Sequence, residues 1–240
     1  MTENWLLLLS EILGVVAVTW IVSKSPRWVL PRVSFRLPQR DGYLALGLFG
    51  SILALAFVYW RTSVDTRLLG GMGNWEQPLL SLLAFTLFVV TLLLLRQPLS
   101  AVGWNMNLLR QGALLGLSLA ILTVFLQGKL SALLDGITPL EGQMLAVCAV
   151  LALAEETIFR GFIQPRLQAW LGRWIGLVLG AVLFALWTLP TALQLSGQVI
   201  ALTFALSFVQ GLVLGWVMDR SGHVLASALY RTISFWIGLM

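Results

Sequence analysis

The sequence predicts an all-α fold, a polytopic transmembrane helical bundle of about eight spans that forms one membrane domain over residues 1–240. Composition is the first reason: 59% of the residues are hydrophobic and only 10% are charged, whereas a soluble domain carries about 25% charged residues. The mean hydropathy of +0.91 agrees. The second reason is that apolar runs of about 20 residues, the length of a helix that crosses a bilayer core of about 30 Å, recur along the chain. Soluble, disordered and fibrous classes are therefore excluded.

Each expected span is a continuous apolar run, without the ten-residue alternation of a membrane β-strand. In chain order the spans lie at residues 5–22, 42–60, 78–95, 111–127, 143–163, 174–189, 198–218 and 222–239. The first is not expected to be a cleaved signal peptide, because Glu3 precedes it where a basic residue would be needed, and no small-residue cleavage site follows it. Residues 23–41 hold three prolines and five basic residues, so we expect a basic loop at the membrane surface.

The distribution of basic residues predicts the orientation of these spans. Ten of them fall in loops on one side of the membrane: Lys24, Arg27, Arg32, Arg36, Arg40, Arg96, Arg110, Arg166, Arg173 and Arg220. The loops on the other side hold Arg61, Arg67 and Lys129. Because basic loops stay in the cytoplasm, both termini are predicted to be external and the loop at 161–173 cytoplasmic. The net charge of +5 does not indicate a nucleic-acid partner, since the basic residues are spread over loops and not clustered on one face.

Ionisable residues inside the expected spans are the candidates for chemistry, because each costs at least about 2.5 kcal/mol in the middle of a membrane helix. Glu155, Glu156, Arg160 and Arg231 qualify, and Glu11 in the first span is a weaker fifth. Glu156 and Arg160 are four positions apart, so they share a helix face and are expected to pair. Glu155 lies about 100° round the helix. A buried acid beside a second acid suits a general base; the alternative is a structural ion pair with one spare glutamate.

The sequence around these acids resembles a known family. Residues 155–161 read EETIFRG and residues 162–167 read FIQPRL, which is similar to the EExxxR signature of the CPBP family, the CAAX-protease and bacteriocin-processing (ABI) family of intramembrane proteases. The likeness extends through the segments at 184–188, 210–216 and 219–222, so that a CPBP-like core is expected over residues 143–239. The resemblance implies a glutamic-type endopeptidase in which the first glutamate, Glu155, activates water. Glu156 and Arg160 would support it.

Two histidines of the family pattern are replaced in this chain. The FxxxH motif runs here from Phe184 to Thr188, and the histidine of the third motif, HxxxN or HxxxD, falls at Arg231, with Phe235 at the Asn or Asp position. Thr188 can donate a hydrogen bond, and Arg231 can stabilise an oxyanion, yet neither does the proton work of a histidine near neutral pH. Alternatively, Arg231 neutralises the spare carboxylate in an inert core. The single histidine, His223, lies eight residues from the family position and is interpreted as an interfacial or capping residue.

Two functions from different classes follow, and the sequence leaves both open. The first is an intramembrane endopeptidase that cleaves a membrane-tethered peptide near the cytoplasmic face, with Glu155, Glu156, Arg160, Thr188 and Arg231 as its site. The second is a catalytically degenerate member that binds membrane proteins or assembles with a membrane complex. A transporter is a weaker third, since broken helices and inverted repeats are missing. The partners are the lipid bilayer with a membrane-tethered peptide, protein or complex, in a bacterial plasma membrane or a related inner membrane.

Other chemistries are excluded by the residues available. One histidine and one cysteine cannot supply a zinc site, and a carboxylate-only Mg²⁺ or Ca²⁺ site is opposed by the nearby arginines, so neither metal nor other cofactor is expected. No GxSG motif supports a serine protease, and Asp219 at a span end has no intramembrane aspartate to pair with. Cys148 is interpreted as a small packing residue, and a disulfide scaffold is excluded because it is the only cysteine.

Overall fold

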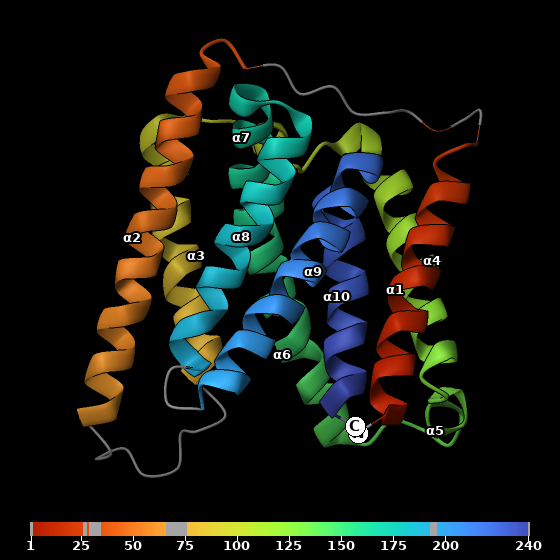
Figure 1. The fold of residues 1–240 in the computed structure, drawn as a ribbon. Coiled ribbons are helices and arrows are strands. Elements are labelled where there is room, and N and C mark those ends of the chain that lie inside the picture. Colours follow the sequence, from red (N-terminus) through yellow and green to blue (C-terminus); the bar gives the residue numbers. More distant parts are fainter. Residues whose placement is uncertain (1, 26–27, 29–34, 66–75, 193–195, 240) are drawn as a thin grey trace.

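The chain folds into a bundle of helices (Figure 1). The computed structural model describes residues 2–25, 28, 35–65, 76–192 and 196–239, and these ranges contain no strand. The long helices are α1 (Thr2–Val22), α2 (Pro38–Asp65), α3 (Glu76–Leu95), α4 (Leu109–Leu126), α6 (Pro139–Glu156), α8 (Arg173–Ala192), α9 (Gly197–Ser221) and α10 (Val224–Leu239). Shorter pieces are η1 (Leu99–Val102), η2 (Met106–Leu108), α5 (Leu130–Leu134), η3 (Thr157–Ile163) and α7 (Gln164–Leu171). The all-α class is confirmed.

Each of the eight expected spans coincides with a helix. In the described part of the chain four helices are long and apolar enough to cross a membrane, at Pro38–Tyr59, Met106–Leu126, Arg173–Pro190 and Gly197–Ser221. Shorter apolar helices lie at Leu6–Val22, Leu79–Leu95 and Val224–Leu239. The remaining expected span, 143–163, is formed by α6 and η3 together. The outward-facing side chains suit a lipid environment, since Leu93, Leu94 and Ile121 are 72%, 79% and 69% exposed.

The polar middle of the bundle is the continuous run from α6 through η3 into α7. η3 has π-helical geometry, a wider turn that is rare and occurs frequently at functional sites. Every residue from 154 to 164 is buried. Gly161 permits this close packing, because a Cβ atom there would lie 2.2 Å from the carbonyl oxygen of Val102 in η1. The sequence did not predict this change of helix type.

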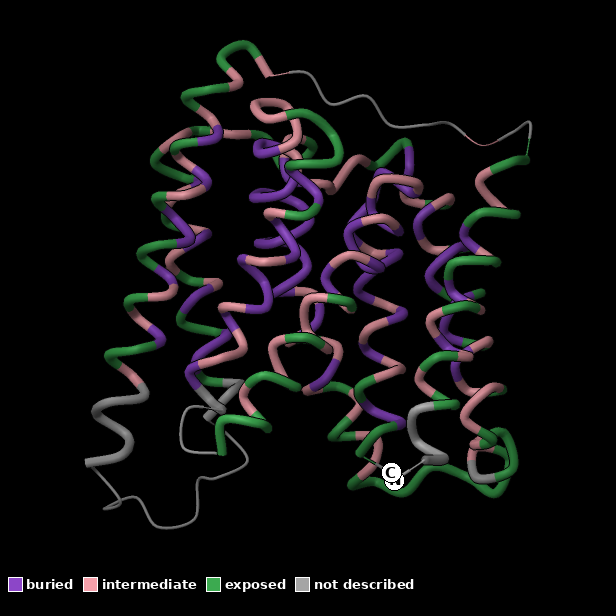
Figure 2. The backbone as a smooth tube through the Cα atoms, in the orientation of Figure 1, coloured by how far each residue is buried: buried purple, intermediate pink, exposed green. Residues whose placement is uncertain are grey.

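α8, α9 and α10 enclose this run. α8 packs along α9, and α10 packs along α4 and α6. The α8–α9 contact is close because position 211 is glycine: a Cβ there would lie 2.9 Å from the Cα of Ala181, and small residues let membrane helices approach. Figure 2 shows the buried backbone concentrated in these central helices, while α2 keeps an exposed outer side. The residues expected to form the site therefore lie in the most deeply buried part of the bundle.

Aromatic side chains form the packed surface beneath the site. Phe159 of η3 contacts Phe184 and Trp187 of α8, with ring centroids 5.3 and 6.2 Å away, and Phe49 of α2 at 6.3 Å. All four side chains are buried. Since buried aromatic rings have few rotamers and large contact areas, this cluster fixes the angle at which α8 meets η3.

Candidate active site

Glu155, Glu156 and Arg160 lie where α6 passes into η3. Their exposed fractions are 3%, 0% and 2%. The Nε atom of Arg160 lies 3.3 Å from Oε2 of Glu156, so the pair that the four-residue spacing predicted is present. A fully buried ion pair is costly to form and costly to break from one side. The three residues therefore act as one electrostatic unit.

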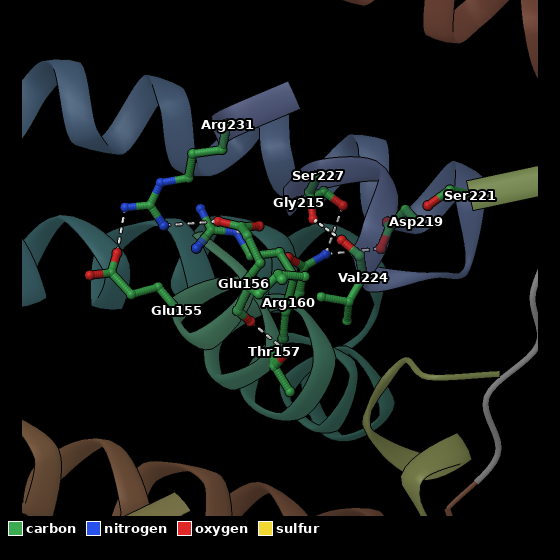
Figure 3. Close-up of polar contacts among 12 residues, drawn as sticks. Glu155, Glu156, Thr157, Arg160, Gly215, Asp219, Ser221, Val224, Ser227 and Arg231 are labelled. Atoms are coloured by element: carbon green, nitrogen blue, oxygen red, sulfur yellow. Dashed lines mark hydrogen bonds and ion pairs between the residues drawn. The ribbon is translucent and has the colours of Figure 1, made fainter. Parts of the chain in front are cut away.

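Arg231 of α10 joins both acids. Its Nη1 donates to Oε1 of Glu156 at 3.1 Å, and its Nη2 donates to Oε2 of Glu155. Figure 3 shows the guanidinium reaching from α10 across to the two carboxylates on α6. Glu156 is thus bound by two arginines, and Glu155 by one. The cluster has two negative and two positive charges, so it is neutral as a whole.

Ser81 and Trp187 complete the surroundings of Glu155, and sequence reasoning missed both. Ser81 of α3 is buried, and its hydroxyl donates to Oε1 of Glu155 at 2.6 Å. Trp187 of α8 is 1% exposed, and its indole lies beside the same carboxylate. The one sequence signal for a role of Trp187 was its position directly before the expected site residue Thr188. Ser81 offered none, because its role depends on how α3 packs against α6.

Phe184 lies under both guanidinium groups. Its ring centroid is 4.0 Å from Cζ of Arg160 and 4.8 Å from Cζ of Arg231. A cation over an aromatic face is stabilised by about 2 kcal/mol or more when it is removed from water. The ring therefore helps to stabilise the two positive charges of Arg160 and Arg231 in one site. Without the ring, only the two carboxylates would balance these charges.

Thr188 is half-buried on α8, one turn after Phe184. Its hydroxyl donates to the carbonyl oxygen of Ala185 at 2.8 Å and lies 3.0 Å from Oγ of Ser207 on α9. The structure thus brings Glu155, Glu156, Arg160 and Arg231 together, while these contacts of Thr188 join α8 to α9.

Two buried N–H donor groups of the site have no hydrogen-bond partner within the part of the chain that the structure describes. They are Nη1 and Nη2 of Arg160. An unsatisfied buried donor costs about 1–3 kcal/mol, and native proteins rarely leave several in one place. These donors are suited to a polar ligand that carries oxygen atoms.

His223, Cys148 and Asp219 lie in separate environments. Nδ1 of His223 accepts a hydrogen bond from the backbone N–H of Leu225 at 3.1 Å, at the start of α10, as a capping residue does. Cys148 is buried against Trp236 in a small apolar cluster. Asp219, on α9, accepts hydrogen bonds from Gln164, Gln168 and Arg173, and these contacts join α7, the start of α8 and the end of α9.

The donor set does not resemble a metal centre. Among the residues that the structure describes, no three His, Cys, Asp or Glu side chains gather as metal ligands. The two acids of the site are already bound by guanidinium groups, so a cation would have to displace an arginine.

Comparison with known proteins bears on the same segment. The chain matches a family model described as Rce1-like, type II CAAX prenyl endopeptidase Rce1-like, over residues 139–236. No curated protein and no solved structure matches it. The matched segment contains Glu155, Glu156, Arg160, Thr188 and Arg231, and it is the segment in which the EExxxR resemblance was found. The resemblance to the CPBP family is therefore confirmed over residues 139–236, the part of the chain that is similar to the Rce1-like CAAX prenyl endopeptidases.

Proposed function

We propose that the protein is an intramembrane endopeptidase of glutamic type that cleaves a lipid-tethered peptide near the cytoplasmic face of a bacterial plasma membrane or related inner membrane. The observation that carries the proposal is the setting of Glu155: a buried carboxylate held by Ser81 and Arg231, beside buried N–H donors that have no described partner. The family match supports a peptidase and a prenylated substrate.

In this reaction Glu155 takes a proton from water, and the resulting hydroxide oxygen attacks the carbonyl carbon of the scissile peptide bond. The tetrahedral intermediate carries a negative oxygen, which the free N–H groups of Arg160 are suited to stabilise. Glu155 then gives its proton to the leaving nitrogen, and the C–N bond breaks. Glu156 and Arg231 act as positioning residues, since they hold the carboxylate of Glu155 and the guanidinium of Arg160 in place.

One observation favours the second candidate, a catalytically degenerate member that serves as a membrane binding or assembly factor. Arg231 stands where the family pattern has a histidine, and it neutralises both acids instead of offering a titratable nitrogen. A general base contributes about 10²–10⁴ in rate, so a carboxylate locked in an ion pair would lose much of that factor.

The two candidate functions are distinguished with a variant that has histidine at the two family positions, 188 and 231. The purified protein in proteoliposomes is incubated with a farnesylated reporter peptide, and its cleavage is followed by mass spectrometry. The proposal expects cleavage by the wild-type protein. If the wild type is inactive while the Thr188→His/Arg231→His double variant cleaves the reporter, the chain is a degenerate member and the proposal is wrong.

A further inference from the structure

An apolar groove of about 790 Å³ runs between α3 and α6. On α3 its lining includes Leu82, Phe85, Val89 and Leu93, which are three or four positions apart and so share one helix face. Leu93 is 72% exposed, and in a membrane that side chain faces lipid. The groove is therefore open to hydrocarbon chains of the bilayer.

The groove ends at a positive charge. Arg96 and Gln97, directly after α3, line that end. Arg96 is exposed and has a left-handed backbone, with φ 50°, a conformation that glycine or asparagine adopts with less strain. A second groove of about 800 Å³ on the other side of α3 also ends in such a pair, Gln39 and Arg40. Both pairs lie at the same end of the bundle, since α2 begins there and α3 ends there (Figure 1).

The length of the α3–α6 groove suits one lipid chain and its headgroup. Leu82 and Arg96 are fourteen positions apart, which is about 21 Å along a helix, and half of a bilayer with its headgroup region is about 20–22 Å thick. An apolar channel that reaches from the middle of the bilayer to an arginine at its surface matches an acyl chain that carries an anionic phosphate. We propose that this groove is a binding site for an anionic phospholipid, with its acyl chain along α3 and its phosphate at Arg96.

The proposal does not rest on catalysis, and binding is measured without a peptide substrate. The purified full-length protein is delipidated in detergent, incubated with phosphatidylglycerol or phosphatidylcholine, and examined by native mass spectrometry. We expect preferential retention of phosphatidylglycerol. Arg96→Gln should reduce that preference about fivefold, the effect of one basic residue at an anionic surface, whereas Arg110→Gln, a change of an exposed arginine outside the groove, should leave it unchanged.

A second matched pair tests the acyl chain. Val89 lines the groove, while its neighbour Val90 is exposed and does not. Val89→Trp should obstruct the groove and abolish retention of both lipids, and Val90→Trp should retain them as the wild type does. Arg96→Gln leaves the packing intact, so it tests the proposal even if Val89→Trp does not fold. Equal retention of the two lipids by the wild type, undiminished retention by Val89→Trp, or binding of a farnesylated peptide but of neither phospholipid would overturn the proposal.

Discussion

The guanidinium of Arg231 is hydrogen-bonded to the carboxylate of Glu155, which lies 76 residues earlier in the chain. This contact places α10 against the end of α6, at the position where the family pattern has a histidine. Arg231 also holds Glu156, so that Glu156 does not depend on Arg160 alone. The stability and the chemistry of the site therefore have to be tested together.

Glu156 should be the most sensitive member of the ion cluster. It is the acid that binds both Arg160 and Arg231, and breaking a buried pair from one side costs about 3–5 kcal/mol. We expect Glu156→Gln to lower the free energy of unfolding in detergent by about that amount. Arg160→Met should cost less, because Glu156 keeps Arg231. The double variant should be more stable than Glu156→Gln alone; additive losses in this double-mutant cycle would contradict the pairing.

Ser81 should stabilise the fold through Glu155. Its hydroxyl donates to a charged, buried carboxylate at 2.6 Å, and such a hydrogen bond contributes about 1.5–3 kcal/mol. Thermal unfolding should therefore show Ser81→Ala to be destabilised by that amount. Ser118→Ala is the control, since Ser118 is an exposed serine that bonds to its own helix. An equal melting temperature for the two variants would show that the Ser81 contact contributes nothing.

Glu11 ties α1, which lies outside the family match, to the helix that carries Arg231. The buried carboxylate of Glu11 accepts hydrogen bonds from Tyr230, Ser234 and Gln127 at 3.0, 2.7 and 2.8 Å. Glu11→Leu leaves these donors unsatisfied, so we expect a loss of at least about 2 kcal/mol in unfolding free energy. Glu11→Gln keeps one acceptor oxygen and should fall between. A Glu11→Leu variant as stable as the control Asp135→Asn, a change of an exposed acid, would refute this role.

The orientation can be measured with single cysteines in a Cys148→Ser background. Gln39, at the start of α2, is exposed on the side that the basic residues predict to be cytoplasmic, and Asp135, after α5, is exposed on the opposite side. A membrane-impermeant maleimide added to intact cells should label Asp135→Cys, while Gln39→Cys should react only after the cells are opened. The reverse pattern would place the site near the external face.

The fold was largely predictable because a bilayer leaves few choices. A long apolar run must form a helix there, since every backbone group needs an internal partner, and this is why the run at 174–189 could be placed as a span. The short helices α5 and α7 and the π-helical turn at η3 were not predictable in that way. They depend on local packing, such as the contact of Gly161 with Val102, which leaves no periodic signal in the sequence.

The site was predictable in part. Glu155, Glu156 and Arg160 stand out because charges inside an apolar span are costly, and the spacing of four made their pairing predictable. Ser81 could not be found, because a serine in an apolar span ordinarily bonds to its own helix, as Ser118 does. Whether Arg231 met one acid or both depended on the angle between α6 and α10, which a single sequence does not specify.

The most direct test of the account is the cleavage rate of Glu155→Gln on a farnesylated reporter, measured together with its melting curve. The variant keeps the shape of the side chain, and Arg231 keeps its contact with Glu156, so we expect a folded protein. Without a carboxylate to accept the proton, the rate should fall by about 10²–10⁴. A Glu155→Gln variant that is stable and cleaves the reporter at the wild-type rate would contradict the account.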